Sequence, residues 1–473
     1  MKLSQSVLGL FTGRRVRGGR ALASGRMMGQ VIARRFLLTA GMLFAVQGIV
    51  ALLGAADLVI PDLPSPIPFE FGRSIHLGLA TLWPFIGTLG LVYYFLVEEL
   101  EHDIFSVRLA NWQFWLVLLS SLGIYGSLAL RIGNGREYLE GMPVFYVGIC
   151  LSLALGALNF YKTLTSDRNA VTPASGVMVI GVFLLLIMLM PNIIHFSNPV
   201  ADEGVKFWMV HLWEEMALEL TTAGFVASFF KTTGMARPQD VEKWLYLEVT
   251  LTVVSALFGT GHHYFWIGYP AYWLVIGFVF SVFQLVPVVF LVHMTYKGLK
   301  RRVSTGRREK LALWLILSSL LYHVLGAYLM GFIISVPWVN LYMHGTFLTS
   351  GHAHLAVFGA LGFLVLGGSY YCLSRGSEPD ERSFRMGVLA VLALNLGLLL
   401  MAGSLLAGGL LQTYFWRVLG MDFMQVMQLV RPYLVLRMAG GGLFTLGDML
   451  LGWQIFKAWK QTRPGSACAH PAD

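Results

Sequence analysis

The stretch Gly351-His352-Ala353-His354-Leu355 decides how this sequence is interpreted, because it places two histidines one residue apart in an apolar region. In an α-helix each residue advances by about 100°, so side chains two residues apart point to nearly opposite sides. One metal ion is poorly placed to bind both histidines, whereas two metal centres flanking the helix are well placed. The spacing therefore predicts two haems separated by one membrane-spanning helix.

The composition is that of an all-α membrane protein. Of the 473 residues, 56% are hydrophobic and only 12% are charged, about half the charged share of a soluble domain. Apolar runs extend well past the ~20 residues that a helix needs to cross a bilayer. We predict twelve transmembrane helices, near 36–58, 74–97, 109–130, 142–164, 174–195, 205–232, 242–268, 271–296, 311–337, 340–373, 384–412 and 434–457.

Basic residues predict the orientation of these helices, because loops rich in Lys and Arg stay in the cytoplasm. They cluster before the first span and again between spans 8 and 9. An even number of spans separates these two clusters, so both lie on the same side of the membrane. The residues are Arg14, Arg15, Arg17, Arg20, Arg26, Arg34 and Arg35, then Lys297, Lys300, Arg301, Arg302, Arg307, Arg308 and Lys310. We therefore expect a multi-pass membrane protein with both termini cytoplasmic. Its parts are a basic cytoplasmic segment (1–35), a catalytic membrane domain (36–460) and a disordered cytoplasmic tail (461–473). The net charge of +9 then reflects topology, and no nucleic acid partner is expected.

Six of the twelve histidines fall in the predicted outer half of the membrane. Ionisable side chains inside a membrane are costly and are usually functional. Unrelated core histidines would rarely share one depth, so metal or haem ligation explains the set better. Its members are His76, His211, His262, His263, His352 and His354.

Two of the spans predict a metal site. His211, Glu215 and Glu219 follow one another at intervals of four and so share a helix face. The adjacent pair His262-His263 lies between glycines in the next span and completes a three-histidine site with His211. The carboxylate of Glu215 is a hard oxygen ligand, which favours iron over copper. Glu219 fits either a further role at this site or a protonated carboxyl group on a proton path.

Together these stretches resemble the haem–copper oxidase superfamily, and within it most closely the catalytic subunits of the cytochrome c-dependent bacterial nitric oxide reductases. The resemblance runs from the first span to the last, and its motifs follow in the family's order. They are Arg73-Ser74-Ile75-His76, Arg136-Glu137-Tyr138-Leu139-Glu140, His211-Leu212-Trp213 with Glu215 and Glu219, Glu242-Lys243-Trp244-Leu245-Tyr246, Gly259 to Gly268, and His344-Gly345-Thr346 followed by His352-Ala353-His354-Leu355.

The resemblance implies a role for each motif position. His76 and His354 would be the axial ligands of a low-spin haem b, and His352 the proximal ligand of a high-spin haem b. A non-haem iron would be held by His211, His262, His263 and Glu215. Arg136 and His344 would lie on the side of the haem propionates, and Glu137 would help to bind calcium. Glu215 and Glu219 would act as catalytic residues that carry protons.

The implied activity is the reduction of two nitric oxide molecules to nitrous oxide and water. Electrons would come from a c-type cytochrome subunit or a soluble donor on the outer face, and the chain would be embedded in lipid. In the oxygen-reducing relatives most similar here, a tyrosine stands at the position of Glu215, so this glutamate favours nitric oxide. Gln284 departs from the family, which usually has a glutamate there. Two alternatives stay open: an oxygen reductase or divergent nitric oxide-converting enzyme of the same superfamily, and a twelve-span proton or metal transporter.

Overall fold

Helices make up almost all of the described chain. The computed structural model describes residues 27–60, 63, 67–301, 306–376 and 378–461, and no β-strand occurs within these ranges. The predicted all-α class is confirmed. Residues 1–26 and 462–473, which hold most of the predicted cytoplasmic segment and tail, lie outside the described residues.

The chain divides into two compact units. The first comprises residues 1–36, 88–124 and 142–303, and the second comprises residues 37–87, 125–141 and 304–473. Helices α2 (Met28–Val59), α3 (Phe69–Leu100) and α4 (Val107–Ala129) contribute to both units. Each unit contains one group of the histidines predicted above.

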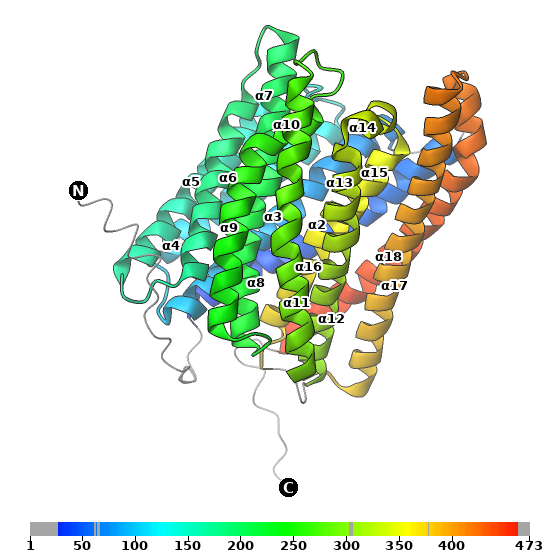
Figure 1. Cartoon of the computed structure of the whole chain (residues 1–473). Coiled ribbons are helices and arrows are strands. Elements are labelled where there is room, and N and C mark those ends of the chain that lie inside the picture. Colours follow the sequence, from blue (N-terminus) through cyan, green and yellow to red (C-terminus); the bar gives the residue numbers. More distant parts are fainter. Residues whose placement is uncertain (1–26, 61–62, 64–66, 302–305, 377, 462–473) are drawn as a thin grey trace. The chain divides into compact units, whose positions relative to one another are not determined.

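In the first unit, α6, α8 and α9 pack against one another (Figure 1). Local sequence fixes where several helices begin: Thr172 and Ser175 form a capping box before α6, and the Asn198 side chain accepts two backbone N–H groups at the start of α7. The elements of this unit after α4 are α5 (Pro143–Ser166), α6 (Pro173–Leu189), η1 (Met190–Ile193), α7 (Pro199–Leu212), η2 (Trp213–Leu218), α8 (Glu219–Thr232), α9 (Pro238–Gly259), η3 (Thr260–His263), α10 (Tyr272–Ser281), η4 (Val282–Gln284) and α11 (Leu285–Arg301).

In the second unit, the long helices α17 and α18 pack along each other, and α15 packs against α17 (Figure 1). Its elements after α4 are α12 (Arg307–Tyr322), η5 (His323–Met330), α13 (Gly331–Ser335), α14 (Pro337–Met343), α15 (Phe347–Ala353), η6 (His354–Gly362), α16 (Phe363–Leu373), α17 (Glu381–Gln412), η7 (Thr413–Val418) and α18 (Phe423–Gln461). The segments η2, η5, η6 and η7 are π-helical.

Eleven helices of the described residues are long and apolar enough to cross a membrane. They coincide with eleven of the twelve predicted spans. The remaining predicted span, 205–232, is the continuous rod α7–η2–α8, whose middle carries Glu214, Glu215 and Glu219. These three carboxyl groups lower its mean hydropathy, and one of them, Glu215, belongs to the candidate metal centre. The chain is thus a multi-pass membrane protein.

One predicted span is wrong in detail. The sequence predicts a single helix over 340–373, but the chain breaks between α14 and α15 at residues 344–346. Gly345 has φ +73°, a left-handed conformation that ends a helix, and the Thr346 hydroxyl then caps the next helix by accepting from the Leu348 N–H. His344 therefore lies at a helix break.

Candidate functional site

The first group of histidines gathers around the π-helical turn of the α7–η2–α8 rod. His211 lies in the last turn of α7, and Glu215 lies in η2. Glu215 Oε1 is 3.1 Å from His211 Nδ1. A π-helical turn inside an α-helix is rare and often marks a functional site.

Close packing between α9 and α10 positions the other two histidines. His262 and His263 lie in the tight turn η3 that ends α9. A Cβ on Gly261 would overlap the Trp273 carbonyl, and a Cβ on Gly277 would overlap the His262 N–H. Glycine at both positions lets α10 approach η3 closely and fixes the direction of the histidine pair.

These four side chains form one cluster, as predicted. One ligand atom from each of His211, Glu215, His262 and His263 lies within 4.8 Å of the others. Glu215 Oε1 lies 4.0 Å from Nε2 of both His262 and His263, and the two Nε2 atoms are 2.9 Å apart. Within the described ranges, no other group of three or more His, Cys, Asp or Glu side chains meets this criterion.

Two observations show that the cluster fits a metal ion. Both ring nitrogens of His211 are buried, and neither makes a well-aligned hydrogen bond within the described part of the chain. The Ser281 hydroxyl donates to the Gly277 carbonyl at 2.7 Å, so it accepts from His262 Nδ1 at 2.9 Å. That hydrogen bond puts the proton on Nδ1 and leaves Nε2 as the ligand nitrogen, as is usual for metal-binding histidines.

Gln284 contacts the cluster directly. Its Nε2 donates to Glu215 Oε2 at 3.4 Å. The sequence identified Gln284 only as a departure from a family pattern. The structure places its amide against the carboxylate that would bind the metal, so this departure lies beside the candidate centre.

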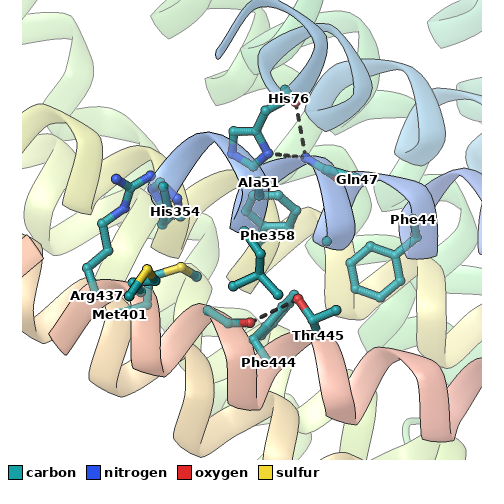
Figure 2. A pocket seen from close by; sticks show the side chains of 15 residues that line it. Phe44, Gln47, Ala51, His76, His354, Phe358, Met401, Arg437, Phe444 and Thr445 are labelled. Carbon is teal, nitrogen blue, oxygen red and sulfur yellow. Dashed lines mark hydrogen bonds between the residues drawn. The ribbon is translucent and has the colours of Figure 1, made fainter. Parts of the chain in front are cut away.

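The second group of histidines lines an apolar pocket in the other unit. The rings of His76 and His354 lie side by side, with centroids 6.1 Å apart and planes inclined by 29° (Figure 2). A metal held at about 2.0 Å from one nitrogen of each ring would separate the centroids by about 6 Å. Phe44, Phe358 and Phe444 supply apolar walls. The pair thus fits the two axial ligands of a haem iron.

Backbone carbonyls orient the two histidines of the His-Ala-His stretch. His354 Nδ1 donates to the Ser350 carbonyl at 2.7 Å, and His352 Nδ1 donates to the Gly326 carbonyl at 2.9 Å. Each contact leaves Nε2 to act as a ligand. His352 contacts η5, whereas His354 lines the pocket with His76, so the predicted divergence of the two side chains is present.

Two polar residues of this pocket were not predicted. Gln47 on α2 is buried, and its Nε2 lies 3.5 Å from His76 Nδ1 and donates to the His76 carbonyl at 3.2 Å. Arg437 on α18 lines the same pocket (Figure 2). The sequence could have predicted a role for Arg437, because an arginine in the middle of a membrane helix is rare without a function.

Glu137, the residue predicted to help bind calcium, is paired with an arginine. Glu137 Oε1 is paired with an Arg73 guanidinium nitrogen at 2.7 Å, and Glu140 Oε1 lies 4.0 Å from Arg73. Calcium needs six to eight oxygen ligands, and the guanidinium already supplies positive charge at this carboxylate. Burial, opposed by Arg73, raises the pKa of Glu140 to about 7.

The propionate-side predictions remain predictions. Arg136 is buried in the connection between α4 and α5, and its backbone N–H donates to the Asn134 side chain at 2.8 Å. The His344 carbonyl accepts from Arg417 at 3.5 Å. Glu219 begins α8, one helical turn after Glu215.

Comparison with known proteins agrees with this geometry. Residues 31–443 match the family described as "Cytochrome C and Quinol oxidase polypeptide I". The chain is 30% identical to a nitric oxide reductase subunit of Stutzerimonas stutzeri, over 89% of this chain and 93% of that protein. It is 23% identical to a Cbb3-type cytochrome c oxidase subunit of the same organism, over 87% of this chain and 90% of that protein.

A solved structure shares the fold. The cryo-EM structure of a heme-copper terminal oxidase dimer superposes with a TM-score of 0.76 at 14% sequence identity, covering 93% of this chain and 85% of that chain. With the match over residues 31–443, the paired histidines and the His/Glu cluster, the chain belongs to the haem–copper oxidase family of cytochrome c and quinol oxidase polypeptide I.

Proposed function

We propose that this protein is the catalytic subunit of a nitric oxide reductase. It would reduce two nitric oxide molecules to nitrous oxide and water, using two electrons and two protons. The observation that carries the proposal is Glu215, a carboxylate within 4.0 Å of the three ligand histidines. A hard oxygen ligand among three imidazoles favours iron over copper.

The similarities support the same choice. The nitric oxide reductase relative is 30% identical, whereas the cytochrome c oxidase homologues are 23–24% identical. Membership of this family makes the chain a membrane oxidoreductase, so the transporter alternative is not retained.

The chain's own residues would do three things in this reaction. His76, His354 and His352 would hold two b haems, and the His/Glu cluster would hold a non-haem iron. When bound, these groups would carry electrons and bring the two nitric oxide molecules together. The protein fixes their ligands on rigid helices, which turns an encounter between two dilute gases into a preorganised one.

The surroundings of the cluster would control charge and protons. Glu215 offsets the positive charge of the metal, and the Gln284 amide orients this carboxylate through the contact at 3.4 Å. Buried Leu212, Met216 and Ala256 pack together beside the cluster and exclude water. Glu219, one turn from Glu215, would hold a proton for delivery to the oxygen that leaves as water.

The remaining assignments belong to this proposal. Electrons would come from a c-type cytochrome subunit or a soluble donor on the outer face of the bacterial inner membrane. Arg136 and His344 would lie on the propionate side. A structural calcium at Glu137 is not part of the proposal, because Arg73 neutralises that carboxylate.

One observation favours a second candidate, an oxygen reductase or a divergent nitric oxide-converting enzyme. Gln284, which contacts Glu215, replaces the glutamate usual in nitric oxide reductases, and several relatives are oxidase homologues. Counting metals and haems in the purified protein separates the two candidates. We expect two b-type haems and one additional iron per chain, with isotopically labelled nitric oxide converted to nitrous oxide. One copper per chain with oxygen consumption and no nitrous oxide would overturn the proposal.

Replacing Glu215 with Gln tests the metal assignment at one residue. A neutral amide is a weak ligand, so we expect metal affinity to fall by about 10- to 100-fold or more and nitrous oxide formation to be lost, with both haems retained. The matched control is Glu214→Gln, which alters the neighbouring carboxyl group of the same π-helical turn. Retention of iron and activity in Glu215→Gln would contradict the assignment.

A further inference from the structure

Glu248 is a buried carboxyl group for which the reaction described above has no role. It lies on α9 and is 2% exposed. Its carboxyl group contacts that of Glu219 on α8, and the Thr252 hydroxyl donates to Glu248 Oε1 at 3.1 Å. Two carboxyl groups in contact with each other are stable only when one of them is protonated.

The same face of α9 continues to the metal cluster. Glu248, Thr252, Ser255 and Gly259 are spaced by four, three and four residues, which places them in one row along the helix. Thr252 is 2% and Ser255 1% exposed, and the Ser255 hydroxyl donates to the Phe280 carbonyl at 2.8 Å. A Cβ on Gly259 would lie only 3.4 Å from His211 Nε2. The row therefore ends at the candidate metal ligands.

The α8 side of the pair approaches the same ligands. Glu219 is four residues after Glu215, one turn along the same rod. Helices α8 and α9 pack against each other, so the carboxyl pair bridges them. The apolar neighbours Leu212, Met216 and Leu220 offer no proton, so a reaction that consumes protons here needs an internal donor.

We propose that the Glu219–Glu248 pair is the proton store of the metal centre, with Glu248 as a positioning residue that acts through Glu219 and the hydroxyl row of α9. This inference rests on the proposed function. In each turnover the electron donor is oxidised and nitric oxide is reduced: an N–N bond forms, one N–O bond breaks, and the released oxygen takes two protons. The pair gives up its shared proton toward that oxygen and is reprotonated before the next proton is needed.

The test uses the purified full chain with the subunits that copurify. Infrared spectroscopy detects the carbonyl stretch of a protonated carboxyl group, with or without turnover. We expect Glu248→Gln to remove this band and to slow nitrous oxide formation at least about tenfold, with unchanged haem and iron contents. Glu248→Asp should restore part of both signals.

Two threonines on the same helix provide a matched pair. Thr252→Val removes the hydrogen bond to Glu248 and should shift the infrared band and slow turnover several-fold. Thr250→Val is the control, because Thr250 is exposed and its hydroxyl donates to the Tyr246 carbonyl. The Thr252 variant still tests the inference if Glu248→Gln does not assemble.

The outcomes separate this inference from the proposed function. A native protein that forms no nitrous oxide contradicts the proposed function, whatever Glu248 does. Native-like turnover together with an unchanged band in Glu248→Gln and Thr252→Val overturns the proton store. Loss of iron with a retained band would show that Glu248 acts only on structure, which also overturns it.

Discussion

At the scale of single residues, the divergence of His352 and His354 places the two side chains in different surroundings. His354 lines the pocket with His76, and His352 donates to the Gly326 carbonyl on η5. We predict that His354→Ala removes the six-coordinate haem spectrum almost completely, because it removes a proposed axial ligand, while the high-spin signal persists. His352→Ala is the comparison and should do the reverse. Visible absorption spectra of the two purified variants measure this, and exchanged results would show that the two assignments are reversed.

Glu140 should make stability depend on pH. Burial raises its pKa to about 7 from an ordinary value of 4.5. Between these values the folded protein keeps a proton that the unfolded chain releases, so this contribution to stability is present below about pH 4.5 and is lost as pH rises through 7. We expect the unfolding temperature of the solubilised protein to fall over this window, and Glu140→Gln to flatten the fall. An equally steep decline in the variant would assign the effect to another group.

The sequence predicted the site residues unevenly. Spacing along the helices and depth in the predicted membrane brought out the six histidines and Glu215, because a charged or ligating side chain in an apolar span has few structural uses. The sequence did not predict contacts between residues that are far apart along the chain. Gln284 meets Glu215 across 69 residues, and Glu248 meets Glu219 from the next helix. Such pairs depend on how helices pack, which a single sequence does not specify.

At the scale of elements, the break between α14 and α15 is the clearest departure from the predicted spans. Hydropathy is continuous across residues 340–373, so the sequence pattern favoured one helix. The left-handed Gly345 and the Thr346 cap interrupt it. Glycine often ends a helix and threonine often caps the start of the next one, but the predicted span followed hydropathy and joined the two helices.

Gly345→Ala should destabilise this break. A side chain in the left-handed conformation costs about 1–2 kcal/mol, so we expect the variant to lose haem at a lower temperature than the native protein. Gly403→Ala is the control: Gly403 lies inside α17, and a Cβ there would meet nothing within 4 Å, so alanine should be neutral or slightly stabilising. Equal heat resistance of Gly345→Ala and the native protein would show that the break tolerates a side chain.

At the scale of the whole molecule, the exposed apolar residues show what surrounds the chain. Along α17, Leu389, Leu392, Leu396 and Leu399 are each 45–58% exposed and recur at helical spacing. An apolar stripe of this length is costly in water and favourable against lipid tails. The surrounding bilayer also explains why the number of spans was predictable. The thickness of the bilayer fixes the length of each apolar helix, whereas no such rule fixes which side chains meet between helices.

The predicted orientation in the membrane concerns every span at once. The connection between α11 and α12 is flanked by Lys297, Lys300, Arg307 and Arg308, and such loops remain cytoplasmic. We expect alkaline phosphatase fused within the 301–306 connection to be inactive in cells, and the same enzyme fused after Asn134, between α4 and α5, to be active. Equal amounts of both fusion proteins must be confirmed by immunoblotting. Because the spans alternate in direction, the reverse pattern would invert the whole molecule, move the predicted outer-half histidines to the cytoplasmic side, and exclude an electron donor on the outer face.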